Sequence, residues 1–233
     1  MSKVYLIPSV LHEAGFASIP AYTLEAIRDC TVIFAENERT TRRFFKALDR
    51  DIVIDHFEWF TIHKAEAEQL QHFKTKIEEN KNIAIVSEAG CPGIADPGQV
   101  LIAAAQQLKC TIKPLTGPSS ILLALMASGL NGQQFEFVGY LPVDTSAREK
   151  MIQQLEQSSA KNNSTKIFIE TPYRNNQLVD SLLKVCNQNT KLCIAVNLTG
   201  PEESIKTRSV GDWKKDKPDI HKQAAIFLIH SST

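Results

Sequence analysis

The sequence predicts an α/β protein, and three observations support this fold class. In the first half, short apolar runs alternate with segments of helical periodicity, which is typical of a mainly parallel sheet. In the second half, five apolar runs with few helices between them indicate a sheet with some antiparallel pairing. The chain has 233 residues, 43% of them hydrophobic, which is enough for two modest domains. We therefore predict two α/β domains, residues 1–130 and residues 131–233.

In the first half, the apolar runs predict five strands. They lie at residues 4–8, 31–35, 51–56, 82–87 and 110–114. The segments between them predict helices at 19–29, 40–48, 65–80, 97–108 and 119–128. Asp96 is expected to cap the fourth helix, with Pro97 in its first position. Parallel sheets bind ligands at the carboxyl ends of their strands, so the loops there are expected to form the site.

In the second half, we expect five strands and two helices. The strands lie at residues 135–140, 166–170, 191–198, 203–209 and 224–230, and the helices at 146–157 and 176–185. The segment 158–164 (SSAKNNS) is polar and predicts a surface loop. The second half thus predicts a mixed sheet.

Composition excludes several classes of protein. Basic and acidic residues both number 26, so the chain lacks the basic excess typical of electrostatic nucleic-acid binding. Its five cysteines include no CxxC pair and its six histidines form no metal-spaced cluster, which favours reduced thiols and no metal. No apolar segment approaches the roughly 20 residues of a membrane span. We expect a cytoplasmic protein without membrane or metal partners.

Two loops have the composition of a ligand site. Residues 87–98 (SEAGCPGIADPG) follow an apolar strand, and their three glycines allow the backbone to approach a ligand closely. Residues 116–120 (TGPSS) open a helix where hydroxyls and free N–H groups can bind polar atoms. Taken alone, each loop is equally explained as a capped strand-to-helix turn. GxGxxG and GxxxxGK[ST] phosphate loops are absent.

Together these loops resemble the tetrapyrrole (corrin/porphyrin) methylase family. Residues 87–98 are similar to its S-D-A-G-T-P-x-I-x-D-P-G pattern, and residues 114–130 (PLTGPSSILLALMASGL) to P-L-P-G-P-S-A-x-x-x-A-L-x-x-S-G-L. Three further segments resemble the branch of the small-subunit ribosomal RNA methyltransferases I, which act on ribose 2′-hydroxyls. They are 35–41 (AENERTT), 137–142 (FVGYLP) and 168–174 (FIETPYR).

The resemblance implies a homodimeric methyltransferase with S-adenosylmethionine in a cleft between its two domains and ribosomal RNA as the acceptor. The positions implied to bind the cofactor are Pro8, Ser87, Glu88, Ala89, Gly90, Ile94, Asp96, Ser119, Ser120, Ile121, Ile169, Asn197, Leu198 and Ala225. Glu36 is the candidate base for a hydroxyl acceptor, although it could equally pair with Arg39. The candidates for substrate binding are Arg39, Thr41 and Arg174.

The chain departs from that branch at three places, one of which is residues 222–224 (KQA), where the branch has K-G-E. Residues 8–14 (PSVLHEA) stand where the branch has P-T-P-I-G-N-L, and residues 195–200 (AVNLTG) where it has A-R-E-L-T-K. The lost Arg and Lys are side chains that contact phosphate. We therefore hypothesise a working cofactor site with a divergent acceptor site. Methylation of a small tetrapyrrole-type molecule, or cofactor binding without catalysis, are the alternatives.

Overall fold

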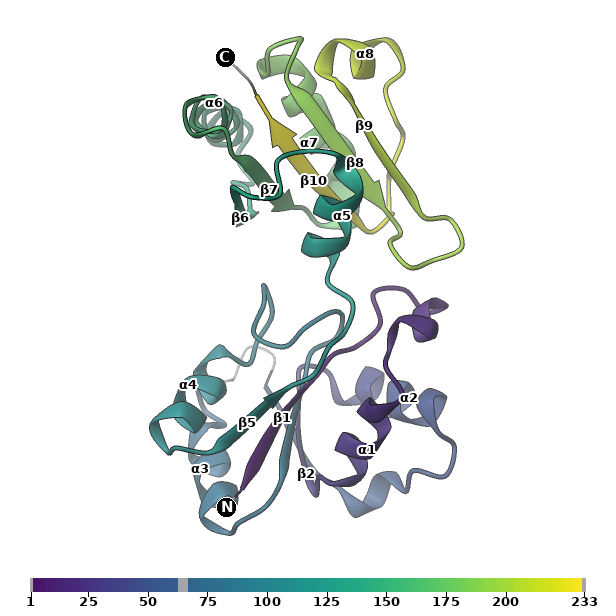
Figure 1. The fold of residues 1–233 in the computed structure, drawn as a ribbon, viewed down its shortest axis with the longest axis vertical. Helices are drawn as coiled ribbons and strands as arrows, with labels where there is room; N and C mark the ends of the chain where they lie inside the picture. Colours follow the sequence, from purple (N-terminus) through teal and green to yellow (C-terminus); the bar gives the residue numbers. More distant parts are fainter. Residues whose placement is uncertain (1, 63–66, 232–233) are drawn as a thin grey trace. The chain divides into compact units, whose positions relative to one another are not determined.

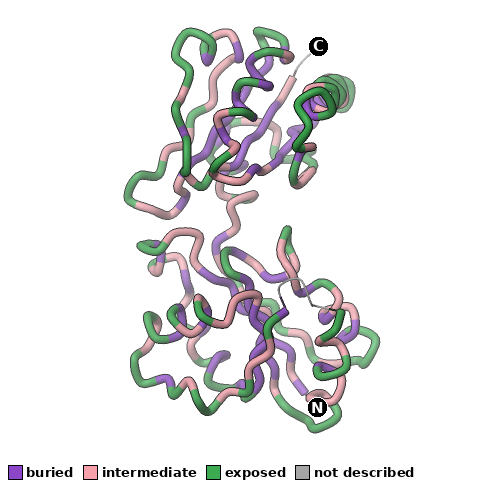
Figure 2. The backbone as a smooth tube through the Cα atoms, turned by 180° about the vertical axis from the view of Figure 1, so that it is seen from behind, coloured by how far each residue is buried: buried purple, intermediate pink, exposed green. Residues whose placement is uncertain are grey.

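The computed structural model describes residues 2–62 and 67–231. Two compact units divide the chain: unit 1, Met1–Ser119, and unit 2, Ser120–Thr233. Each unit is built around one five-stranded sheet (Figure 1). In both units the most buried segments are the central strands, as Figure 2 shows. The α/β fold class predicted from the sequence is thereby confirmed.

The sheet of unit 1 is entirely parallel. Its strands, in the spatial order β3-β2-β4-β1-β5, all pair in the parallel sense. They are β1 (Lys3–Ile7), β2 (Val32–Ala35), β3 (Glu58–Thr61), β4 (Ile83–Val86) and β5 (Thr111–Pro114). Every residue of β2 and β4 is buried, because helices cover both faces of the sheet.

The helices of unit 1 form two layers. They are α1 (Tyr22–Arg28), α2 (Glu38–Leu48), α3 (Leu70–Glu78) and α4 (Gln99–Gln107), with short 3₁₀ turns at Gly15–Ser18 and Ile54–His56. Alternate strand residues face opposite layers: Ile33 packs with Phe45 of α2, whereas Phe34 packs with Phe73 of α3. Figure 1 shows α1 and α2 on one face and α3 and α4 on the other. All carboxyl ends of the strands therefore share one edge of the unit.

The sheet of unit 2 is mixed. Its strands are β6 (Phe135–Tyr140), β7 (Thr165–Ile169), β8 (Lys191–Val196), β9 (Ser204–Ser209) and β10 (Ala225–His230), in the spatial order β6-β7-β10-β8-β9. Only β6 and β7 pair in parallel; β10 runs antiparallel to both of its neighbours. The carboxyl ends of β7 and β8 therefore meet the start of β10 at one edge of the sheet.

The helices of unit 2 are α5 (Ser120–Ser128), α6 (Thr145–Asn162), α7 (Asn175–Val185) and α8 (Val210–Lys215), with a 3₁₀ turn at Pro172–Arg174. The buried core lies between the sheet and α6, α7 and α8. Helix α5 packs against β8, β9 and β10. Because of these contacts the chain divides before α5, at Ser119/Ser120, whereas the sequence predicts the division after it, at residue 130.

Two predictions for unit 1 are wrong in their placement. The strand predicted at 51–56 lies instead at Glu58–Thr61, because that segment pairs with β2 and stacks Phe60 on Phe34, with ring centroids 4.7 Å apart. Asp96 does not cap α4. The helix begins at Gln99 after Gly98, whose φ of 124° turns the chain into it. The predicted helix 65–80 begins at Leu70 in the described part of the chain, and its residues 65–66 lie outside the described residues.

Two features of unit 2 also differ from the sequence-based expectation. The polar segment 158–164 mostly continues α6, which ends at Asn162 with Asn163 in the left-handed region (φ 48°). Ser159 is buried there and donates its hydroxyl to the carbonyl of Ser164, so polarity alone was misleading. Helix α8 was not predicted. It begins at Val210, after the N-cap residue Ser209, whose hydroxyl accepts the N–H of Asp212.

Across residues 2–62 and 67–231, none of the helices combines the length and apolarity needed to cross a membrane. Over the same described segments, His, Cys, Asp and Glu side chains do not gather in groups of three or more that could hold a metal ion.

Candidate functional site

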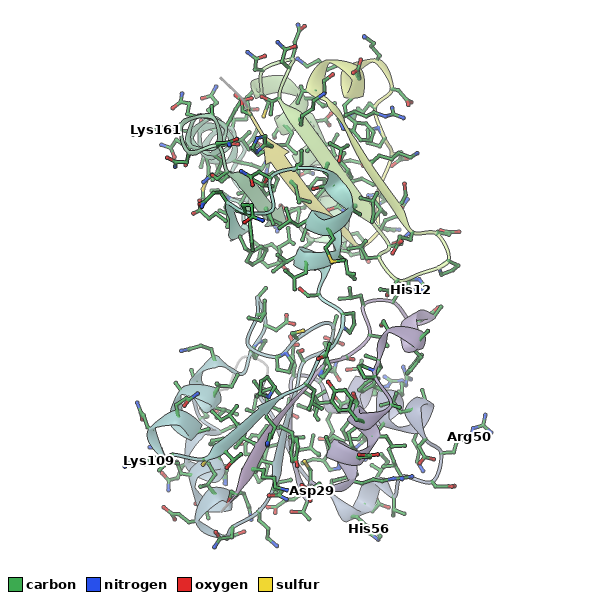
Figure 3. The ribbon with its side chains drawn as sticks, in the orientation of Figure 1. His12, Asp29, Arg50, His56, Lys109 and Lys161 are labelled. Carbon is green, nitrogen blue, oxygen red and sulfur yellow. The ribbon has the colours of Figure 1, made fainter. Side chains whose placement is uncertain are left out.

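Loops from two neighbouring strands are joined by backbone hydrogen bonds at the carboxyl edge of unit 1. The N–H of Ser9, after β1, donates to the carbonyl of Gly90, after β4, at 2.8 Å, and the N–H of Gly90 returns a bond to Ser9 at 3.2 Å. His12 projects from the same loop at this end of the unit (Figure 3). The loop predicted to carry the cofactor is thus fixed to the loop that diverges from the family pattern.

Helix α2 is attached to the same place through its cap. The side chain of Asn37 accepts the N–H groups of Arg39 and Thr40, at 3.1 and 3.4 Å, which starts the helix. The amide nitrogen of Asn37 donates to Oε1 of Glu88 at 3.2 Å. One asparagine therefore both begins α2 and holds the loop after β4.

Glu36 is oriented by the backbone of that loop. Its Oε2 accepts the N–H of Glu88 at 2.8 Å. The described residues contain no ion pair between Glu36 and Arg39, which was the alternative reading of this carboxylate. Arg39 is exposed on the first turn of α2, whereas Thr41 is only 2% exposed and lies inside unit 1.

Asp96 is a third carboxyl group at this edge. Burial, followed by the neighbouring charges of Glu36 and Glu88, raises its pKa to about 7. A carboxyl group with a pKa near neutrality can hold or release a proton at working pH, while an ordinary carboxylate cannot.

The glycine-rich loop needs its glycines. Gly90, Gly93 and Gly98 all have positive φ, between 75° and 124°. In the next loop, a Cβ on Gly117 would lie 2.1 Å from the Cβ of Pro8, so only glycine allows these two segments to touch. Among the loop residues predicted to bind the cofactor, Ser87 and Gly90 are buried, whereas Glu88, Ala89 and Ile94 are exposed.

A cavity of about 350 Å³ opens beside these loops within unit 1. Its walls are largely apolar, and the rings of Phe16 and Phe44 stack in it with centroids 6.0 Å apart. Its lining comprises Ser9, Val10, Leu11, His12, Glu13, Phe16, Thr40, Arg43, Phe44, Ala47, Glu88 and Ala89. The segment 10–13, where the chain departs from its family, therefore forms one wall of the cavity.

In unit 2, the other predicted positions gather at one edge of the sheet. Ile169 ends β7, Asn197 follows β8 with a φ of 51°, and Ala225 begins β10. The N–H of Asn197 donates to the carbonyl of Ala224 at 2.9 Å, and the adjacent Leu198 is buried. Ser120 and Ile121 begin α5, and Ser119 ends unit 1.

Arg174 lies near this edge, after β7. Its Nε and Nη2 both donate to Oε1 of Glu170, at 2.9 and 2.6 Å. A second cavity of unit 2, about 290 Å³, lies between β8, β9 and the segment after α8. None of the predicted site residues lines it, so we assign it no part in the site.

Sequence reasoning missed several residues that build this site. The Glu88–Asn37 contact joins residues 51 positions apart, and no local pattern signals it. Phe16 and Phe44 look like ordinary core residues in the sequence, although they line the cavity. Glu170 lies within a family-like segment, but its role as the anchor of Arg174 depends on the turn at Pro172.

Known proteins resemble the chain along most of its length. The profile of the family "Tetrapyrrole (Corrin/Porphyrin) Methylases" matches residues 17–213. A "Ribosomal RNA small subunit methyltransferase I" from Vibrio cholerae is 28% identical over 97% of this chain and 76% of its own length. The protein of that name from Synechocystis is 30% identical over 88% of this chain and 70% of its own length.

Solved structures show the same fold. The methyltransferase CobJ superposes with a TM-score of 0.64 at 16% identity, over 99% of this chain and 93% of its own. A uroporphyrin-III C-methyltransferase from Thermus thermophilus, complexed with S-adenosylhomocysteine, gives a TM-score of 0.60 at 12% identity, over 99% and 98% of the two chains.

The fold and the loops at the strand ends define a methyltransferase, with S-adenosylmethionine as its methyl donor. The chain belongs to the tetrapyrrole (corrin/porphyrin) methylase family. The family, the enzyme class and the cofactor predicted from the sequence are confirmed.

The contact between Gly117 and Pro8 makes a prediction about stability. Gly117→Ala should destabilise the protein by about 1–3 kcal/mol, because the new methyl group forces the two loops apart. Gly132→Ala is the matched control, since a Cβ there meets nothing within 4 Å. Urea denaturation followed by circular dichroism measures both. Equal midpoints for the two variants would show that the loops do not touch.

The raised pKa of Asp96 makes a prediction about pH. The unfolded carboxyl group ionises near its model value of 3.8, whereas the folded one keeps its proton to about pH 7. The folded state therefore binds more protons in this window, and stability falls as pH rises from about 4 to 7. In Asp96→Asn this fall should be smaller. Urea midpoints from pH 4 to 8 test this, and parallel curves for the two proteins would refute it.

Proposed function

We propose that the protein transfers the methyl group of S-adenosylmethionine to a ribose hydroxyl of ribosomal RNA. The observation that carries this proposal is the placement of Glu36. Its Oε2 is held by the N–H of Glu88, a residue that also lines the 350 Å³ cavity. The relatives named ribosomal RNA small subunit methyltransferase I support the choice of acceptor.

The residues present fit the cofactor. The loop after β4 turns at Gly90 and Gly93, which have positive φ and no side chain, so a ligand can approach the backbone closely there. Glu88 and Ala89 beside them are exposed. We propose that the 87–94 loop binds the cofactor, together with Pro8 and Asp96. When bound, S-adenosylmethionine supplies a methyl group on a cationic sulfur, which needs no metal.

The chain's own groups then have to orient the acceptor and take its proton. Glu36 uses Oε2 for the bond from Glu88, and within the described residues its Oε1 makes no hydrogen bond. This oxygen can accept the proton of a ribose hydroxyl, so that the hydroxyl oxygen would take the methyl group from the bound cofactor, whose sulfur would leave as a neutral thioether. Because the N–H of Glu88 already holds the carboxylate of Glu36, this side chain does not lose further conformational freedom when the acceptor binds.

The cavity beside Glu88 suits part of an RNA acceptor. Pockets for small ligands span about 300–1,000 Å³, so this one takes a group the size of a heterocycle rather than a macrocycle. Its apolar walls and the Phe16–Phe44 pair favour a flat ring, and Arg43 at the cavity offers a donor. We propose that Arg39 and Arg174 contribute to binding the RNA backbone.

We also propose that the protein is a cytoplasmic homodimer. The cytoplasmic location is supported by the five cysteines, none of which forms a disulfide bond. Exposed Leu122 and Met126 on α5, at 53% and 79%, support an apolar contact with a second copy. Light scattering in solution tests the assembly, and a monomeric mass at micromolar concentration would contradict it.

The proposed function is tested with a labelled methyl donor. The protein is incubated with S-adenosylmethionine carrying a labelled methyl group and with either small ribosomal subunits lacking their methylations or a uroporphyrinogen-type tetrapyrrole. We expect label in the ribosomal RNA alone. Label in the tetrapyrrole would establish the small-molecule alternative, and cofactor binding without any transfer would establish a non-catalytic protein.

Glu36→Gln should lower kcat by about 10²- to 10⁴-fold, the usual contribution of a general base, while the affinity for S-adenosylmethionine stays within a few fold. Glu38→Gln is the matched control, because Glu38 pairs with Arg42 on the surface of α2. Single-turnover transfer to ribosomal subunits and titration calorimetry provide the two readouts. An unchanged rate in Glu36→Gln would remove Glu36 from the mechanism.

A further inference from the structure

An exposed aromatic side chain lies among cations on unit 2, outside the predicted site. Tyr173 is 69% exposed at the centre of the turn Pro172–Arg174. The ring of His221 meets it edge-on, with centroids 6.1 Å apart and planes at 74°. The Nζ of Lys222 lies 5.9 Å from the centroid of the same ring. One face of the ring is therefore open to solvent beside a positive charge.

The two segments that form this cluster are fixed to each other. The N–H of Lys222 donates to the carbonyl of Pro172 at 3.0 Å, and Lys222 has a φ of 61°. This left-handed backbone is unfavourable for lysine and persists because the bond to Pro172 holds it. On the other side, Asp219 accepts the N–H of His221 and the amide of Asn176, so its carboxylate is engaged. The backbone segments that carry the ring and the ammonium group are thus fixed to each other.

Arg174, next in the chain, is held by a buried carboxylate. Glu170 is 1% exposed at its side chain, and its Oε1 accepts the N–H of Thr171 as well as two N–H groups of Arg174. The planar guanidinium is locked on one side, and its remaining donors point away from Glu170. The side chain of Arg174 is 31% exposed, so those donors are accessible.

This combination matches the chemistry that recognises unpaired RNA. Single-stranded bases stack on exposed aromatic rings, while lysine and arginine contact the phosphates on either side. A duplex hides the faces of its bases within the stack and offers nothing for the ring to contact. The chain has no overall basic excess to attract phosphates, so a local stacking site adds to what electrostatic attraction supplies.

We propose that Tyr173, His221 and Lys222 form a stacking platform for one unpaired base of the RNA substrate. This proposal rests on the proposed function, because the platform would bind a part of the same RNA substrate. Tyr173 provides the stacking face, Lys222 a phosphate contact, and His221 supports the ring from its edge. Arg174, fixed by Glu170, binds an adjacent phosphate.

The test uses a short single-stranded RNA with one 2-aminopurine, whose fluorescence is quenched when the base stacks. The wild-type protein and Tyr173→Phe should quench it and bind with similar affinity. Tyr173→Ala should lose the quenching and bind at least about tenfold more weakly. Lys222→Ala should keep the quenching and lower the salt dependence by about one phosphate contact. Lys161→Ala, an exposed lysine on α6, is the matched control (Figure 3).

The same variants separate this proposal from the proposed function. In methyl transfer to ribosomal subunits, Tyr173→Ala should raise KM and leave kcat and cofactor affinity unchanged, which also shows that the variant folds. Quenching by wild-type protein without any transfer to RNA would refute the function and keep the platform. Transfer by Tyr173→Ala with an unchanged KM, or the absence of quenching by wild type, would overturn the platform.

Discussion

The paired backbone hydrogen bonds between Ser9 and Gly90 are the constraint on which the site depends. They join the loops after β1 and β4, strands that are neighbours in the sheet but far apart in the chain. Without them, the N–H of Glu88 would not be held in front of Glu36, and the cavity would lose the contact between two of its walls. Gly90 reaches this geometry with a φ of 75°, which favours glycine.

The electrostatics of the site bear on how a protein without net charge would bind the anionic substrate that we propose. Three carboxyl groups, those of Glu36, Glu88 and Asp96, gather at the strand ends of unit 1, where they would repel phosphate. Burial and this mutual repulsion raise the pKa of Asp96, which limits the negative charge at neutral pH. We therefore propose that a hydroxyl and a flat ring bind at this edge, and that Arg39, Arg174 and Lys222 contact phosphates.

Hydrophobic periodicity predicted most of the strands and helices, and the ordered motifs predicted the family, because both are visible in short stretches of sequence. The predictions were wrong where a contact with a residue outside the stretch determined the secondary structure. The segment 51–56 alternates as a strand should, yet β2 pairs with Glu58–Thr61. The polar run 158–164 mostly continues a helix, in which the buried Ser159 donates its hydroxyl to the carbonyl of Ser164. Likewise, the motif 35–41 predicted Glu36, but only the fold shows that Glu88 orients it. The platform at Tyr173 depends on a contact with residues almost 50 positions away.

In the proposed function, Glu36 and the loops around it position a ribose hydroxyl of ribosomal RNA and take its proton, so that its oxygen receives the methyl group. Mass spectrometry of nucleosides from small-subunit RNA, after reaction with the protein and S-adenosylmethionine, tests this claim most directly. The account predicts one new methylated nucleoside whose added mass lies on the ribose and remains there after the base is released. A methyl group on the base, or RNA with no added methyl group, would contradict it.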